Sequence, residues 1–139
     1  MIRPAPEFRL LASRLLGSEA GGQQEAPDLV DAAETICRKI HEQLASLIGA
    51  EGVRALMIRA LHLAKDGHPL FQRVEIGSES EAYLKGLRQS AQGLEPTEIR
   101  RGIVTFLGNF VWLLATFIGE ALALRLVARI WPDVSAEDE

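Results

Sequence analysis

The sequence predicts an all-α protein, a bundle of five to six helices around a long, mostly apolar C-terminal helix. Three observations predict this fold class: apolar residues recur at helical spacing, glycines and prolines separate the periodic segments, and residues 103–119 carry no charge. A chain of 139 residues is long enough to form one core. We therefore expect a single helical domain over residues 1–139.

The first helical segment is a short N-terminal arm over residues 5–17. Phe8, Leu11 and Leu15 fall on one side of this helix. The glycine- and glutamine-rich residues 18–27 then predict a flexible linker. An arm of this kind docks on the body of the domain or on a partner, so Phe8, Leu11 and Leu15 are interface candidates.

Two amphipathic helices are predicted after the linker. The first begins at Pro27 and places apolar residues on one face, at positions 29, 33, 36, 37, 40, 44, 47 and 48. Gly49 and Gly52 end it and allow a tight reversal. A third helix then runs over about residues 53–65.

The segment over residues 67–80 interrupts the helical pattern. Phe71, Val74 and Ile76 give it partial strand character, but one short strand has no partner within the chain unless a second copy supplies it. We expect a loop with extended character, in which Phe71 is another interface candidate. A modestly amphipathic fourth helix is predicted over about residues 80–92. No internal repeat is apparent.

The last helical segment runs from about residue 97 to Trp131, where Pro132 prevents its continuation. A helix of about 35 residues would be roughly 50 Å long at 1.5 Å per residue, which exceeds a compact small domain. We therefore expect a bend near Gly108 or Gly119. Trp131, at the end of this segment, is an interface candidate.

The uncharged stretch over residues 103–119 suits either a bilayer or a soluble core, because its length is at the lower limit for a membrane span. At 100° per residue, four polar side chains fall within about 60° of one another and form a polar seam. They are Thr105, Asn109, Thr116 and Glu120. A lipid-facing helix gains nothing from such a seam, so we favour the soluble core. The alternative is a membrane-anchored or membrane-active protein built around residues 103–124.

Glu120, Asn109 and Thr116 are the ligand or switch candidates of this seam. Burial of Glu120 among its apolar neighbours would raise its pKa, which suits a ligand contact or a proton-sensitive switch. A structural salt bridge, or exposure at a bend near Gly119, would explain the same carboxylate without a function.

No catalytic residues are predicted, and no cofactor. Glu34, Cys37 and His41 share one helix face at a spacing that could supply metal ligands, but amphipathic helices often group such residues, and we predict no metal. His41-Glu42 begins the H-E-x-x-H pattern of zinc peptidases, yet Ala45 stands where the second histidine is required. We therefore predict that the protein is not an enzyme.

Charge and cysteine content limit the class of partner. The net charge is −4, and the acidic tail over residues 133–139 contains four of the nineteen acidic residues, which leaves fifteen against fifteen Lys and Arg. Without a basic surplus, no nucleic-acid partner is predicted. The single cysteine, Cys37, agrees with a cytoplasmic location.

These observations favour a non-enzymatic interaction or regulatory module that acts through a homo- or hetero-oligomeric helical surface. The alternatives are the membrane-associated protein described above and a bundle that binds a small apolar ligand along the seam. An apolar helix among amphipathic ones resembles the architecture of colicin pore domains, but no motif assigns the chain to a family.

Overall fold

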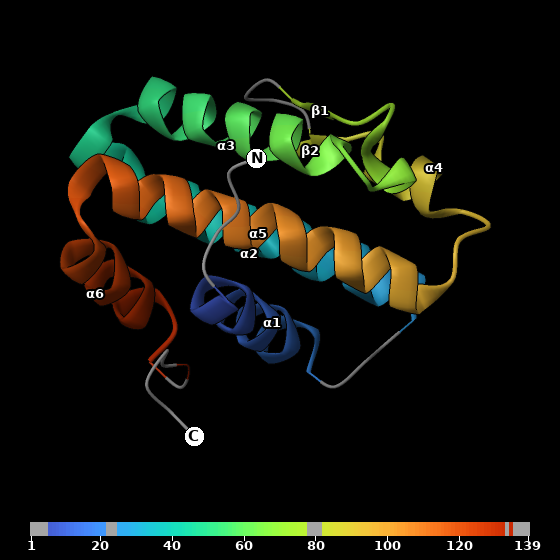
Figure 1. Cartoon of the computed structure of the whole chain (residues 1–139), viewed down its shortest axis with the longest axis horizontal. Helices are drawn as coiled ribbons and strands as arrows, with labels where there is room; N and C mark the ends of the chain where they lie inside the picture. Colours follow the sequence, from blue (N-terminus) through green and yellow to red (C-terminus); the bar gives the residue numbers. More distant parts are fainter. Residues whose placement is uncertain (1–5, 22–24, 78–81, 133, 135–139) are drawn as a thin grey trace.

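The computed structural model describes residues 6–21, 25–77, 82–132 and 134, and it confirms the all-α fold class (Figure 1). In this part of the chain the helices are α1 (Pro6–Ala20), α2 (Ala26–Ile48), α3 (Ala50–Lys65), α4 (Leu87–Ala91), α5 (Pro96–Ile118) and α6 (Glu120–Ile130). A short helical turn, η1 (Pro69–Phe71), and two short strands, β1 (Glu75–Ile76) and β2 (Leu84–Lys85), connect α3 to α4. One hydrophobic core includes side chains from all six helices.

Helix α5 lies at the centre of the molecule, between α1 and α3 and in front of α2 (Figure 1). Helices α2 and α5 run in the same direction, so their C-terminal ends meet at one end of the bundle (Figure 1). Because helices surround α5, its side chains form much of the core; Phe106, Phe110 and Leu114 are all almost fully buried. This position accounts for its apolar composition.

Helix α5 is long and apolar enough to cross a membrane, with a mean hydropathy of 1.5 over its most apolar window. However, 61% of that window is buried inside the protein. The core helix of a soluble bundle and a membrane-spanning helix have the same length and composition, and only the packing distinguishes them.

The predicted bend lies at Gly119, which separates α5 from α6. Gly119 has φ 98° and ψ 144°, a conformation that is accessible to glycine and strained for other residues. Its N–H still donates to the carbonyl of Ala115, at 2.7 Å, so the helix ends with a closed turn. Gly108 causes no break. It lies inside α5 and faces the backbone of Phe8 and Arg9 on α1.

An internal repeat that the sequence did not make apparent relates α2–α3 to α5–α6. Helices α2 and α5 both span 23 residues, and each ends at a glycine with the same unusual backbone: Gly49 has φ 86° and ψ 150°. The two glycines are 70 positions apart (119 minus 49) and close the related sequences LASLIG and LATFIG. The structure therefore contains two matching helix–glycine–helix units.

The buried residues after Gly49 and after Gly119 are also 70 positions apart in the sequence. Val53, Met57 and Leu61 are buried on the α3 side, and Ala123, Val127 and Trp131 are buried at the corresponding positions of the second unit. The correspondence between the two units is not apparent in the sequence because other elements cover more sides of α5 than of α2. The central position of α5 requires Gly108 and Asn109 where α2 has the more exposed Arg38 and Lys39.

The segment between α3 and α5 corrects two predictions. Ile76 pairs with Leu84, and Glu75 with Lys85, in an antiparallel hairpin, so the extended segment does find a partner within the chain. The predicted helix over residues 80–92 is reduced to α4, because residues 84 and 85 belong to a strand and Gly86, with φ 92°, precedes the helix. Residues 78–81 lie outside the described part.

The bounds of the arm and linker also differ from those predicted. Helix α1 continues to Ala20, and α2 begins at Ala26, so most of the predicted linker over residues 18–27 is helical where it is described. Residues 22–24 lie outside the described part. Of the predicted acidic tail, only Val134 is described, and its side chain is buried.

Candidate functional site

The three ligand or switch candidates of the polar seam lie in different surroundings. Asn109 is buried, and its side-chain amide donates to the carbonyl of Ala60 on α3 at 3.3 Å, which satisfies a polar group inside the core. Thr116 is exposed, and its hydroxyl donates to the carbonyl of Trp112 one turn earlier, at 2.9 Å. Glu120 is exposed in the first turn of α6, where its charge suits the helix dipole.

The predicted interface residues are part of the protein's own core. These side chains are Phe8, Leu11, Leu15, Phe71 and Trp131, all of them buried. The Phe71 ring packs against Phe106 of α5, with 6.2 Å between ring centroids. The Trp131 indole N–H donates to a carboxylate oxygen of Glu19 at 2.8 Å, which fixes the end of α6 to α1. Their packing within one chain explains why the sequence has large apolar residues there.

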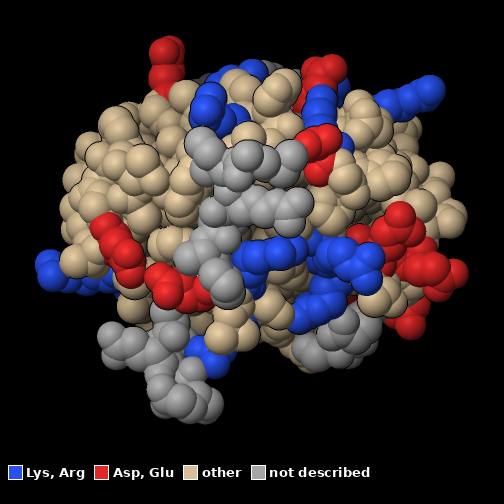
Figure 2. Space-filling model, in the orientation of Figure 1, with Lys and Arg blue, Asp and Glu red and all other residues tan. Residues whose placement is uncertain are grey.

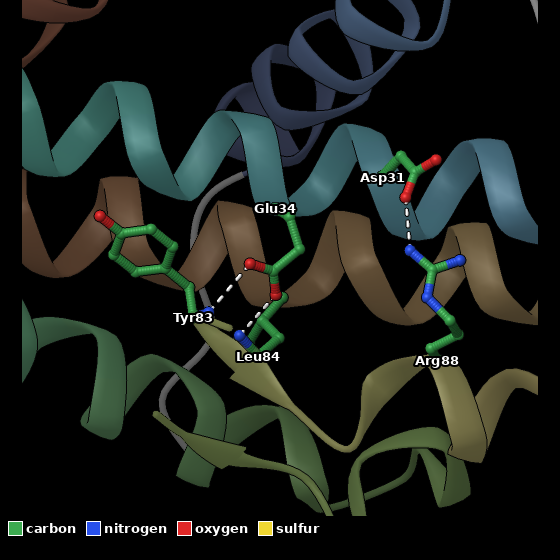
Figure 3. A network of polar contacts seen from close by, with 5 residues as sticks. All are labelled: Asp31, Glu34, Tyr83, Leu84 and Arg88. Carbon is green, nitrogen blue, oxygen red and sulfur yellow. Dashed lines mark hydrogen bonds and ion pairs between the residues drawn. The ribbon is translucent and has the colours of Figure 1, made fainter. Parts of the chain in front are cut away.

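The Glu34 carboxylate holds the β-hairpin against α2 (Figure 3). Its two oxygens accept the backbone N–H groups of Tyr83 and Leu84, at 2.9 and 2.7 Å. Nearby, a guanidinium nitrogen of Arg88 lies 2.5 Å from a carboxylate oxygen of Asp31, both exposed (Figure 3). The half-buried carboxylate of Glu34 therefore has a structural role that depends on residues far away in the sequence.

The remaining metal-ligand candidates on α2 are not arranged as a metal centre. Burial, and secondarily the charge of Glu34, raise the pKa of the Cys37 thiol well above its ordinary value. A protonated thiol is a poor ligand and a poor nucleophile. The His41 ring instead lies near Tyr83, with 5.9 Å between ring centroids. The described residues contain no group of three metal-ligating side chains.

A group of basic side chains lies on the face that α1 and α5 share (Figure 2). Arg9 of α1 and Arg101 of α5 are exposed, and neither has a hydrogen bond or ion pair with another described residue. Both act on His68, at the start of η1: partial burial first, then the charges of Arg101 and Arg9, lower the pKa of this imidazole, while Glu98 opposes them. We refer to Arg9, His68 and Arg101 as the basic cluster.

The two glycine turns lie at the same end of the bundle (Figure 1), and three exposed apolar residues lie within three positions of these turns in the sequence. Leu47 is 52% exposed, Phe117 66% and Leu122 36%. Leu47 and Phe117 occupy the same position in the two matching units, two residues before Gly49 and Gly119. We refer to Leu47, Phe117 and Leu122 as the apolar end.

The chain matches no protein-family model, no curated protein and no solved structure. Function is therefore inferred from the two surfaces described above. Neither was predicted from the sequence. The basic cluster joins residues from three separate segments, and the apolar end depends on the parallel arrangement of α2 and α5. The similarity of LASLIG to LATFIG was the signal that could have indicated the second surface.

Proposed function

We propose that the protein is a non-enzymatic helical interaction module of the cytoplasm that binds a partner protein through the apolar end. The observation that carries this proposal is the exposure of Leu47, Phe117 and Leu122 at one end of the bundle. Scattered apolar residues on a surface need no explanation, but apolar residues that gather together mark interaction sites. Phe117 is the most exposed of the large apolar side chains described, which suits an aromatic anchor.

The charges around the apolar end indicate the chemistry of the partner. Residues 41–53 and 102–124 contain no Lys or Arg. Glu51 and Glu120 are exposed in the first turns of α3 and α6, two residues after Gly49 and one residue after Gly119. An apolar surface with acidic neighbours complements an amphipathic helix whose apolar face is flanked by basic residues. We propose a basic amphipathic helix as the partner.

The same charges disfavour the membrane alternative at this surface. Anionic lipid headgroups attract Lys and Arg, and the acidic residues Glu51 and Glu120 would be repelled. The burial of 61% of the most apolar window of α5 also favours a core helix over a membrane span.

The experiment measures the affinity of a fluorescently labelled synthetic helix of leucine and lysine, with a matched helix of leucine and glutamate as the charge control. We expect the lysine helix to bind and the glutamate helix to bind far more weakly. Phe117→Ser should weaken binding of the lysine helix by about tenfold or more, the equivalent of about 1.4 kcal/mol. Because Phe117 is exposed, this change should leave the fold intact, as judged by circular dichroism.

Leu10→Ser is the matched control, because Leu10 is a half-exposed apolar residue on α1, outside the apolar end. It should leave the affinity unchanged. Equal affinity of Phe117→Ser and the unaltered protein, or equal binding of the two peptides, would contradict the proposal. Stronger binding to anionic lipid vesicles than to the lysine helix, lost in Phe117→Ser, would also contradict it in favour of a membrane surface.

A further inference from the structure

The second surface, the basic cluster, lies near a threonine hydroxyl on α5 that has no hydrogen-bond partner among the described residues. This hydroxyl oxygen, Thr105 Oγ1, is buried. A helical threonine hydroxyl ordinarily donates to a carbonyl one turn earlier, as Thr116 does to Trp112. A buried hydroxyl without a partner costs free energy, so its presence calls for a physical reason.

Thr105 lies on α5 within about one turn of Arg101 and of the positions that His68 and Arg9 approach. Residues three and four apart on a helix are neighbours, and Thr105 is four residues after Arg101. It is also three residues after Gly102 and three before Gly108. The other two members of the basic cluster approach α5 at these two glycines.

Both approaches are at ordinary van der Waals distance from α5. A Cβ atom at Gly102 would lie 3.7 Å from His68 Nδ1, and one at Gly108 would lie 3.6 Å from the Arg9 Cα. His68 and Arg9 therefore approach α5 about one turn before and one turn after Thr105. Neither arginine has a carboxylate partner among the described residues. Like charges held close together without a counter-charge repel one another.

We propose that Arg9, His68, Arg101 and Thr105 form a binding site for a small divalent oxyanion of the sulfate or phosphate type. The two guanidinium groups would donate charge-assisted hydrogen bonds to the anion, and the Thr105 hydroxyl would donate another. The anion would supply the counter-charge that the arginines lack and the acceptor that the hydroxyl lacks. This site is separate from the apolar end and does not depend on the function proposed for it.

Protonation of His68 should couple anion binding to pH. Arg101 and Glu98 from α5 and Arg9 from α1 are the charged residues that act on this imidazole in the described part of the chain, and its pKa is lowered from the ordinary 6.5. A bound anion favours the charged imidazolium, so affinity should increase as the pH falls through that pKa. Sulfate is the suitable probe because its charge stays constant in this range.

The test is a titration of the full chain with sulfate, compared with chloride at equal ionic strength and followed by the NMR signals of the His68 ring. We expect saturable shifts with sulfate alone, and tighter binding at about pH 5.5 than at about pH 7.5. Arg101→Gln and Arg9→Gln should each weaken binding by about fivefold or more. Arg129→Gln, an exposed arginine on α6, is the control and should bind sulfate as the unaltered protein does.

Thr105→Val distinguishes a binding role from a structural one. Removing an unsatisfied hydroxyl should leave the thermal unfolding temperature unchanged or raise it, while sulfate affinity falls. Equal affinity in all variants, or shifts that chloride reproduces, would overturn the proposal. Inorganic phosphate and a nucleoside monophosphate are then compared at pH 7. Tighter binding of the nucleotide than of phosphate would identify a phosphorylated small molecule as the ligand. Equal binding of the two would identify a free oxyanion as the ligand. Binding of neither would overturn the proposed site.

Discussion

Glu34 illustrates how far a single residue can be interpreted without its surroundings. Its position beside Cys37 and His41 on one helix face is visible in the sequence, although amphipathic helices often group such residues without a metal. Its actual partners, the backbone N–H groups of Tyr83 and Leu84, were not visible, because they lie 49 and 50 residues away in a hairpin that was not predicted. A carboxylate that binds backbone groups leaves no sequence pattern.

Replacing Glu34 by glutamine should destabilise the protein. The amide keeps one acceptor oxygen but turns an N–H₂ donor toward one of the two backbone donors. We expect the free energy of unfolding to fall by about 2 kcal/mol, because hydrogen bonds to a charged group are involved and the hairpin loses its attachment to α2. Urea denaturation measures this change.

Asp31→Asn is the matched control for Glu34→Gln. It removes an acidic residue one turn earlier on α2, and its ion pair with Arg88 is exposed. Exposed pairs contribute roughly 0–1 kcal/mol, so this variant should remain close to the unaltered protein. Equal destabilisation by both substitutions would show that loss of charge on α2, rather than loss of the backbone hydrogen bonds, is the cause.

At the scale of elements, the long helices were predictable and the short segments were not. Repeated apolar positions over 23 residues identify α2 and α5, and Pro96 and Gly119 mark the ends of α5. Strands of two residues are too short to show a period, and β1 and β2 form only because they pair with each other and because Glu34 holds β2. Sequence periodicity cannot detect such mutual dependence.

The glycine turns are the elements that define the repeat, and alanine substitution tests them. A Cβ at Gly49 or Gly119 would meet no atom within 4 Å, so any cost of alanine comes from the backbone alone. Both residues have φ near 90°, and we expect Gly49→Ala and Gly119→Ala each to lower the free energy of unfolding by about 1–3 kcal/mol. Thermal and urea unfolding provide the measurement.

Gly17→Ala is a control that should change the free energy of unfolding in the opposite direction. Gly17 lies inside α1, does not have positive φ, and a Cβ there also meets no atom within 4 Å. Alanine at such a position should stabilise the protein by roughly 0.5–1 kcal/mol, because it favours the helix over the unfolded chain. If Gly119→Ala were equally stabilising, the turn between α5 and α6 would not need glycine.

At the scale of the whole molecule, the position of α5 explains both the apolar stretch and the hidden repeat. The second helix–glycine–helix unit places its first helix in the centre, with α1 and α3 on either side, while the first unit leaves α2 more exposed (Figure 1). The two units therefore differ in composition although their turns and buried positions correspond. Apart from the short segments LASLIG and LATFIG, the correspondence is carried by backbone conformation and burial rather than by residue identity.

A comparison of two phenylalanines in α5 tests whether that packing, rather than a lipid environment, accounts for the apolar helix. Phe106 is 1% exposed and contacts Phe71, whereas Phe117 is 66% exposed. In a soluble bundle, Phe106→Ala should lower the free energy of unfolding by about 3–5 kcal/mol through the lost contacts and the remaining cavity. Phe117→Ala should change it by less than about 0.5 kcal/mol, and both proteins should purify without detergent. A chain that requires detergent, with similar small effects of the two substitutions, would instead place both rings against lipid, where neither leaves a cavity in a packed core.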